Sequence, residues 1–437
     1  MNLPTLPDMA ALVPHAVDWG VVAVFGVVYL GMFLGGLPRL KLDRSGVALL
    51  GAIAMIGLTG MPMEEAARSV DLPTVVLLFS FMVVSAQMRL GGFYDAVTHS
   101  VGTLPLSRPW LLAALIVVAG ALSAVFSNDI ICLAMAPVVA RLCLKRGLDP
   151  LPFLVGLACA ANIGSAATLI GNPQNMLIGS VLKLPFGGYA RVALVPVLAS
   201  LALLWLWLAF GPGRRQAGAS QAAGPGALPP EVSTPVPADV AQPFDRLQTA
   251  KGLTVALVLM AVFLFTDIPR DEAALVGAGV LLLSRRLHSA DVMGFVDWPL
   301  LLLFIGLFVV NHAFQGTGLA AEGVAWLSGH GVHVNQPGAL LVLGALLSNL
   351  VSNVPAVMLL LPHLGEPGGA AAQQAGMLLA LASTFAGNLL LVGSIANLIV
   401  VDLAEKAGIR IDWRQHARTG IPVTLGSLGL VWGWWVG

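Results

Sequence analysis

Four clusters of amide and hydroxyl side chains interrupt long apolar runs of this sequence, and they are its strongest candidates for chemistry. Polar groups are costly in hydrocarbon unless they are paired, so such residues mark a site or a packing contact. Asparagine both donates and accepts hydrogen bonds, so these clusters can hold an ion or a small oxyanion without a charged side chain. The candidate residues are Ser127, Asn128, Asp129, Asn162, Gly171, Asn172, Asn175, Ser352, Asn353, Asn388, Gly393, Ser394 and Asn397.

Glycine and proline inside one of these clusters predict a broken helix. Pro173 lacks an amide hydrogen and clashes with the preceding turn, while Gly171 permits unusual dihedral angles. Such a break frees backbone carbonyls for a cation and presents helix N-termini to an anion. The alternative is that these polar residues are helix caps and interhelical contacts.

Asp129 is the one carboxylate that we place at the middle of the membrane. An acid inside a membrane is a functional candidate by default, and it could bind Na⁺ or carry a proton. The alternative is a cap on the helix that follows, where negative charge is favourable. The matching position of the second half is Val354, so we expect only one half to carry coupling chemistry.

The composition excludes whole classes of protein. Of 437 residues, 57% are hydrophobic and only 10% are charged, with net charge zero, and the mean hydropathy is +0.88. A soluble enzyme carries about 25% charged residues, and a nucleic-acid binder needs basic patches. The three cysteines suggest neither a disulfide framework nor a metal site, and we expect no cofactor. The sequence therefore predicts an all-α polytopic membrane protein that is not an enzyme.

Apolar stretches long enough to cross a bilayer predict about ten transmembrane helices. We place them at residues 17–37, 44–60, 72–89, 153–180, 189–210, 252–268, 272–284, 298–316, 373–400 and 420–436. The helices at 153–180 and 373–400 are the two expected to be broken. Two further apolar pairs, 108–145 and 337–362, each bend at a polar tip and have short arms. We interpret them as re-entrant hairpins, which are tolerated only inside protein or along a wet cavity.

The basic residues predict the orientation of the chain. With ten spans and two hairpins, 18 of the 22 Lys and Arg residues fall on one side, and only Arg68, Lys183, Arg191 and Arg270 fall on the other. Basic residues accumulate in cytoplasmic loops, so both termini are expected outside a cell membrane (the inner or plasma membrane).

Landmarks recur at a nearly constant offset and predict an internal repeat. Asp71 matches Asp297 at 226, and Asn128 matches Asn353 at 225. We therefore divide the chain into a first repeat at 1–210, a flexible cytoplasmic linker at 211–250 that is rich in Pro, Ala, Gly and Ser, and a second repeat at 251–437. Each repeat holds five spans, an odd number, so the second is inverted relative to the first. Inverted repeats with broken helices at the midplane are typical of secondary transporters.

On these residues the chain resembles the ion transporter superfamily, which includes divalent-anion:sodium symporters, citrate-transporter-like permeases and arsenite-efflux permeases. The resemblance rests on the tips Ser127-Asn128-Asp129 and Ser352-Asn353-Val354-Pro355 and on the break from Asn162 to Gly171-Asn172-Pro173-Gln174-Asn175. Divalent-anion symporters carry Ser-Asn-Thr at both tips. The Asn-Asp pair in this chain looks more like the arsenite-efflux branch.

The resemblance implies two cation sites with the substrate between them. One Na⁺ site would involve Ser127, Asn128 and Gly171, and the other would involve Ser352, Asn353 and Gly393. It also implies a transport unit of hairpins and broken helices that slides against a scaffold, and a scaffold that forms a homodimer.

Three functions stay open at this point. The first is a secondary active transporter of a small anion or neutral oxyacid, coupled to H⁺ or Na⁺ through Asp129. The second is a Na⁺/H⁺ antiporter in which Asp129 exchanges the two ions. The third is a membrane partner or sensor that transports nothing. The sequence contains no Gly-x-x-x-x-Gly-Lys-Ser/Thr motif, so energy would come from an ion gradient or a separate ATPase.

Overall fold

The computed structural model describes residues 19–37, 40–211 and 244–436. Helices make up most of these residues, and none of them belongs to a β-strand. This confirms the all-α class. The first half contains α1 (Trp19–Leu34), α2 (Arg44–Thr59), α3 (Met63–Arg68), α4 (Leu72–Leu90), α5 (Phe93–Thr103), α6 (Arg108–Ser123), α7 (Asn128–Lys145), α8 (Leu151–Ser165), α9 (Pro173–Val181) and α10 (Phe186–Ala209).

The second half repeats this order of elements. It contains α11 (Arg246–Phe265), α12 (Arg270–Leu282), α13 (Ser289–Met293), α14 (Trp298–Gln315), α15 (Leu319–Gly329), α16 (Pro337–Val351), α17 (Asn353–Leu360), α18 (Ala370–Ala386), α19 (Ile395–Lys406) and α20 (Trp413–Val436), with short 3₁₀ turns at Leu361–His363 and Leu391–Gly393. The helices α2, α3, α4 and α5 begin at residues 44, 63, 72 and 93, and α12 to α15 each begin 226 residues later.

Matching side chains start matching helices in the two halves. The carboxylate of Asp71 accepts a hydrogen bond from the amide of Thr74 at 2.9 Å and begins α4. The carboxylate of Asp297 accepts from the amide of Leu300 at 2.9 Å and begins α14. An Asp at this position satisfies one of the backbone donors that a helix N-terminus leaves unpaired. The landmark that the sequence repeats therefore has a local structural cause.

The chain forms two compact units, and each takes residues from both halves. The first comprises 302–333 and the described part of 1–70, and the second comprises 71–301 and 334–437, again as far as they are described. The predicted boundary at 211–250 therefore does not separate the compact units. In the first unit α1 and α2 pack closely, because Gly31 faces Val47 and Gly51 faces Val28.

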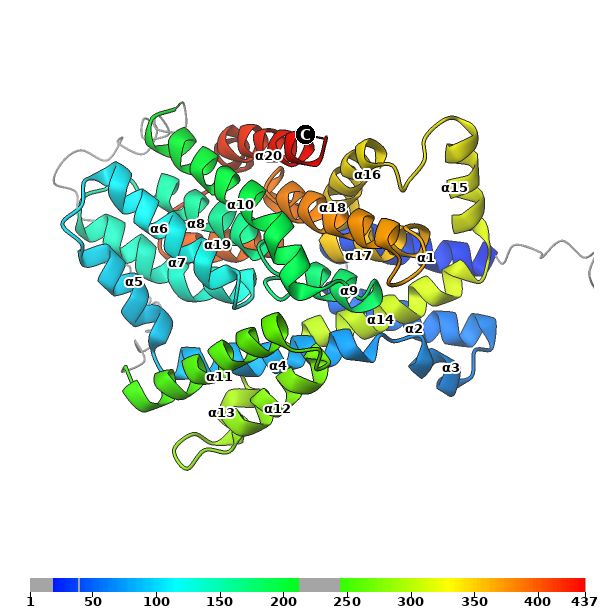
Figure 1. Cartoon of the computed structure of the whole chain (residues 1–437), viewed down its shortest axis with the longest axis horizontal. Helices are drawn as coiled ribbons and strands as arrows, with labels where there is room; N and C mark the ends of the chain where they lie inside the picture. Colours follow the sequence, from blue (N-terminus) through cyan, green and yellow to red (C-terminus); the bar gives the residue numbers. More distant parts are fainter. Residues whose placement is uncertain (1–18, 38–39, 212–243, 437) are drawn as a thin grey trace, which may run out of the picture. The chain divides into compact units, whose positions relative to one another are not determined.

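The second unit holds both predicted hairpins and both broken helices. The helices α6, α7 and α8 lie side by side with α19, and α10 crosses beside them (Figure 1). The helix α18 packs against α16 and α20. The helices α11 and α12 pack together and against α4. Elements far apart in the sequence thus meet around the two breaks.

The lengths of the helices agree only in part with the predicted spans. Four described helices, α4, α10, α11 and α14, are long and apolar enough to cross a membrane. The other predicted spans are also helical, but they are shorter, interrupted or, in α20, less apolar. The first hairpin differs from the short arms that we expected. Its helices have 16 and 18 residues, or about 24 and 27 Å, close to the roughly 30 Å of hydrocarbon.

The predicted linker at 211–250 lies mostly outside the described residues. Its last residues are helical rather than irregular, because α11 already begins at Arg246. Asp245 causes this early start by accepting hydrogen bonds from the amides of Leu247 at 2.8 Å and Gln248 at 3.2 Å.

Candidate binding site at the helix breaks

The amide of Asn162, in α8, lies at the centre of the polar residues. Its Oδ1 accepts hydrogen bonds from Asn128 Nδ2 at 2.9 Å and from Ser394 Oγ at 3.0 Å. Its Nδ2 donates to Asn388 Oδ1 at 2.8 Å and to Asn397 Oδ1 at 3.1 Å. Asn162 is 2% exposed, and these four bonds use its full hydrogen-bonding capacity. One side chain of α8 therefore joins the tip of the first hairpin to the residues around the second break.

Two asparagines hold the two breaks in the same way. Asn175 Nδ2 donates to the carbonyl of Thr168 at 3.1 Å, and Asn397 Nδ2 donates to the carbonyl of Leu390 at 3.2 Å. Each bond reaches back seven residues, across the break that precedes the helix. A side-chain oxygen also caps the helix that follows each break. Asn172 caps α9, and Ser394 caps α19. The sequence predicts these breaks, and both have the same construction.

Backbone oxygens crowd around Gly171 and link the first break to the first hairpin. A methyl group on Gly171 would overlap the carbonyl oxygen of Ser165 and lie 2.7 Å from that of Ser123. The carbonyl of Gly171 itself accepts a hydrogen bond from the amide of Asn128 at 3.2 Å. Only a residue without a side chain lets the hairpin and the break approach this closely.

The second break has a comparable arrangement around Gly393. A methyl group there would lie 2.9 Å from Asn349 Oδ1 and 3.1 Å from the carbonyl oxygen of Gly387. A methyl group on Gly387 would lie 3.1 Å from Asn353 Nδ2. The tip of the second hairpin therefore contacts the second break, as the first tip contacts the first break.

Each hairpin tip leaves buried oxygens without a hydrogen-bond partner among the described residues. In the first tip these are Ser123 Oγ and Asn128 Oδ1, and in the second they are Ser348 Oγ and Asn353 Oδ1. Asn349 Oδ1 is also unpaired. Buried polar atoms are normally satisfied, so a matched pair in each repeat calls for a ligand or ordered water. Oxygens of this kind suit a hard cation such as Na⁺ or the hydroxyl groups of a solute.

The two tips differ in backbone conformation. Ser127 lies in an ordinary extended region with φ −50°. Ser352 has φ 76° and ψ 160°. This backbone conformation is essentially restricted to glycine, and any other residue that adopts it is destabilised by about 1–3 kcal/mol. It is the single residue between α16 and α17, whereas four residues separate α6 from α7. The second tip is therefore sharper, and it is strained.

Asp129 lies in the first turn of α7 and is half-buried. Within the described part of the chain its carboxylate accepts no hydrogen bond, so it does not act as the side-chain cap that we gave as the alternative. Its place in the first turn still suits the positive end of the helix dipole. The carboxylate is left available for an ion or a proton.

Several polar residues of this site are not among the candidate residues named from the sequence. Thr384 Oγ1 accepts from Asn172 and Gln174, each at 3.2 Å, and donates to Asn175 at 3.3 Å. Tyr189 donates to the carbonyl of Ala166 at 2.7 Å, and His416 contacts the carbonyl of Asn388 at 2.9 Å. Ser123 and Ser348 could have been found, because they lie 225 residues apart, as do Asn128 and Asn353.

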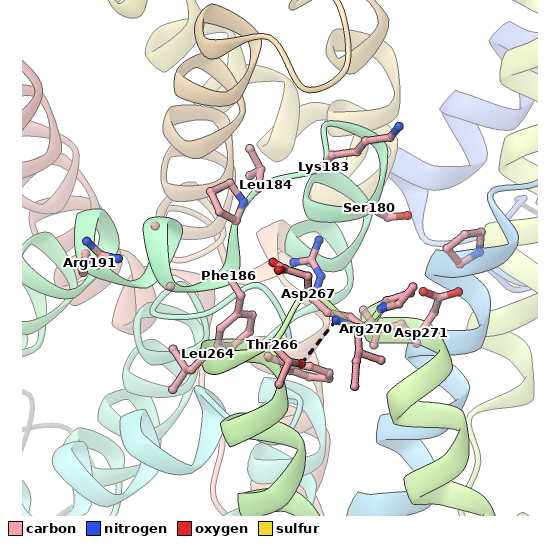
Figure 2. Close-up of a pocket in the computed structure, with 18 residues that line it drawn as sticks. Ser180, Lys183, Leu184, Phe186, Arg191, Leu264, Thr266, Asp267, Arg270 and Asp271 are labelled. Atoms are coloured by element: carbon pink, nitrogen blue, oxygen red, sulfur yellow. Dashed lines mark hydrogen bonds between the residues drawn. The ribbon is translucent and has the colours of Figure 1, made fainter.

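A separate cavity of about 680 Å³ is lined by the first turns of α4, α10 and α12 and by the last turns of α9 and α11. Lys183, Arg191 and Arg270 line it together with Asp267 and Asp271 (Figure 2). The guanidinium of Arg270 donates to the carbonyl of Gly179, near the end of α9, at 2.7 Å. The hydroxyl of Ser180 donates to Asp71 at 2.9 Å. None of the hairpin-tip residues lines this cavity, so it is distinct from the site at the breaks.

Comparison with known proteins agrees with the resemblance seen in the sequence. The model of the citrate transporter family matches residues 29–375. The silicon efflux transporter LSI3 of Oryza sativa subsp. japonica is 30% identical and is matched over 92% of this chain and 94% of its own. The inner membrane protein YbiR of Escherichia coli is 31% identical over 82% of this chain and 86% of its own. The putative transporter arsB of Dictyostelium discoideum is 23% identical over 89% and 86%.

A solved structure supports the fold alone. The YdaH transporter of Alcanivorax borkumensis superposes with a TM-score of 0.54 over 97% of both chains, at 15% identity. The family match covers most of the chain, and the relatives named above include transporters over nearly their whole length. The chain is therefore a membrane transporter that belongs to the citrate transporter family.

Proposed function

We propose that this transporter is a secondary active carrier of a small oxyanion or neutral oxyacid, coupled to H⁺ or Na⁺. The observation that carries the proposal is the matched pair of unpaired oxygens, Ser123 with Asn128 and Ser348 with Asn353, at the two hairpin tips. Their ligands would be cations beside Gly171 and Gly393, with the solute between the tips. One cation would bind at Ser127, Asn128 and Gly171. The other would bind at Ser352, Asn353 and Gly393.

The repeated order of helices supports an inverted-repeat arrangement for this site. The contacts between loops support the predicted grouping of loops by side. Arg270 donates a hydrogen bond to Gly179, and Gln373 donates one to Lys183. All four residues lie at helix ends or in loops that are predicted to face outward. Trp207 bonds to Arg418 and Arg146 bonds to Leu104, and all four are predicted to face inward. On this scheme both termini lie outside, and ten spans enclose two hairpins, of which the first has arms of nearly full membrane length.

The chemistry of the site favours a solute rich in hydroxyl groups. The bonds around Asn162 and Thr384 involve amides, hydroxyls and carbonyls, and no basic side chain takes part in them. A multiply charged anion would therefore depend on bound cations for its countercharge. Arsenite and silicic acid, the solutes suggested by the names of two relatives, need no such countercharge when they are neutral. Citrate is the charged alternative suggested by the family's name.

Transport by the purified protein in liposomes tests the proposal. Arsenite, silicic acid and citrate are each offered under an imposed pH or Na⁺ gradient. Uptake or release of one of them should occur and should be lost in Asn128→Ala. The exposed Asn335, in the loop before α16, provides the matched control as Asn335→Ala. Absence of flux for every solute under either gradient would contradict the proposed substrate class and coupling.

A Na⁺/H⁺ antiporter is the second candidate, because the carboxylate of Asp129 is half-buried and accepts no hydrogen bond from the described residues. Asp129→Asn separates the two functions. An antiporter should lose all exchange of Na⁺ for H⁺, because no other group would carry the proton. An oxyacid carrier should keep uncoupled counterflow of its solute while losing its response to the gradient.

A further inference from the structure

A second cavity borders the first hairpin turn and the first break, because Ala124 and Ala167 line it, but none of the candidate polar residues does. It has a volume of about 400 Å³ and is bounded by α6, α8 and α10. Every residue that lines it is apolar, including Gly120, Gly164, Leu198 and Leu201. A methyl group on Gly164 would overlap the backbone of Gly120, so α6 and α8 touch there with no side chain between them. The small residues leave a hollow that the larger side chains of α10 border.

One face of α10 joins this hollow to a positive charge. Leu194, Leu198, Leu201 and Trp205 line the hollow, and Arg191 lies three residues before the first of them. The spacing alternates between three and four residues, so these positions share one stripe of the helix. From Leu194 to Trp205 the stripe is about 16 Å long, close to the roughly 15 Å depth of one leaflet.

The charge of Arg191 is not neutralised by any described part of the protein. Its side chain is exposed and makes no hydrogen bond or ion pair with any residue that the structure describes. It borders the charged cavity but projects on the opposite side from Lys183 and Asp271 (Figure 2). A cation without a partner among the described residues, one helical turn from an apolar hollow, suits an amphiphile that has one anionic end.

We propose that α6, α8 and α10 bind an anionic phospholipid, with one acyl chain in the hollow and the phosphate on Arg191. A guanidinium can donate two parallel hydrogen bonds to a phosphate. Water is a poor occupant, because an apolar hollow offers it no hydrogen-bond partner. Leu194 and Leu198 are 49% and 55% exposed, and Val117 in α6 is 61% exposed, so the hollow is open at the surface of the protein, where a lipid chain can enter it.

The lipid site is tested on purified full-length protein in neutral detergent. Phosphatidylglycerol, phosphatidylcholine and glycerol 3-phosphate are each titrated while the melting temperature is followed, and bound lipid is counted by native mass spectrometry. Phosphatidylglycerol should stabilise the protein at about five-fold lower concentration than phosphatidylcholine, the effect of one basic residue near a headgroup. Glycerol 3-phosphate should have no effect, because it has no acyl chain.

Two variants assign the effect to its parts. Arg191→Gln should abolish the preference for phosphatidylglycerol, while Lys183→Gln, which removes a neighbouring charge, should preserve it. Ala202→Phe, which fills the hollow, should weaken stabilisation by both lipids. Ala261→Phe, at an exposed position of α11, is its control. If Arg191→Gln unfolds, Arg191→Lys should keep the preference, and its loss would count against the proposal.

Three results would overturn the lipid site. Equal stabilisation by the two lipids in the unaltered protein would remove the role of Arg191. Stabilisation by glycerol 3-phosphate alone would point to a site for soluble anions in the neighbouring cavity. A shift from dimer to monomer caused by Ala202→Phe, with lipid binding unchanged, would identify a second copy of the chain as the occupant.

Discussion

Asn162 is the single residue on which the polar site depends most. Its amide bonds to Asn128, Asn388, Ser394 and Asn397, and all of these bonds are shielded from water. Among the side chains of the site, it connects the first hairpin directly to the second break. Substitutions at this position should therefore affect both halves of the chain together.

Replacing Asn162 by Ala should destabilise the protein strongly. Each buried group that loses its partner costs about 1–3 kcal/mol, and four groups are affected. The melting temperature in detergent should fall by much more than for Asn335→Ala, whose side chain is exposed. Equal melting temperatures for the two variants would show that the bonds around Asn162 contribute little.

Replacing Gly171 by Ala should separate the first hairpin from the first break. The added methyl group would overlap the carbonyl oxygen of Ser165, and overpacking of this kind costs about 1–3 kcal/mol. Stabilisation by Na⁺, or the Na⁺ dependence of flux, should weaken at least ten-fold if a cation binds there. Gly57→Ala in α2 is the control, because nothing lies within 4 Å of the added methyl group. Unchanged Na⁺ dependence would remove Gly171 from the cation site.

At the scale of helices, the second hairpin is the more strained of the two. It turns on one serine with a positive φ, whereas the first hairpin turns over four residues. Strain of this kind persists only where the surroundings enforce it, and it often accompanies a binding site. We expect the second tip to be the one that reorganises more on binding.

Replacing Ser352 by Gly should relieve this strain. Glycine adopts the observed dihedral angles freely, so unfolding should require about 1–3 kcal/mol more free energy, apart from the entropy that glycine adds to the unfolded chain. The melting temperature should rise while binding of solute or Na⁺ weakens, because the hydroxyl group is lost. Ser352→Ala separates the two effects, since it removes the hydroxyl but keeps the strain. A lower melting temperature in Ser352→Gly than in Ser352→Ala would contradict a strained tip.

Much of the helical arrangement is readable from the sequence, and the reasons are physical. Polar residues inside apolar runs are rare, so Asn128, Asn162, Asn353 and Asn388 stand out from their neighbours in the chain. The short helices α3, α5, α13 and α15 were not predicted, because their mixed composition shows no long apolar run. The bonds of Asn162 to the second half were not predictable either, because they depend on how helices distant in sequence pack together.

At the scale of the whole chain, the orientation in the membrane is the main prediction left to test. Thr266 and Ser289 are both exposed, and the topology places them on opposite sides. An impermeant maleimide applied to intact cells should label Thr266→Cys and not Ser289→Cys. The native cysteines Cys132, Cys143 and Cys159 are buried, so the unaltered protein should give little background. The reverse labelling pattern would invert the proposed topology.

The hydrogen bonds from Asn162 in the first half to Asn388 and Asn397 in the second suggest how such a chain could have arisen. An asparagine amide is complementary to another asparagine amide, because each carries both donors and an acceptor. Two identical half-length polypeptides could therefore pair through such a surface about a twofold axis, as in an isologous dimer. After gene duplication and fusion, one half could acquire Asp129 while the other kept an aliphatic residue at Val354. A symmetric ancestor would have had to place the same charge, or none, on both sides of its solute.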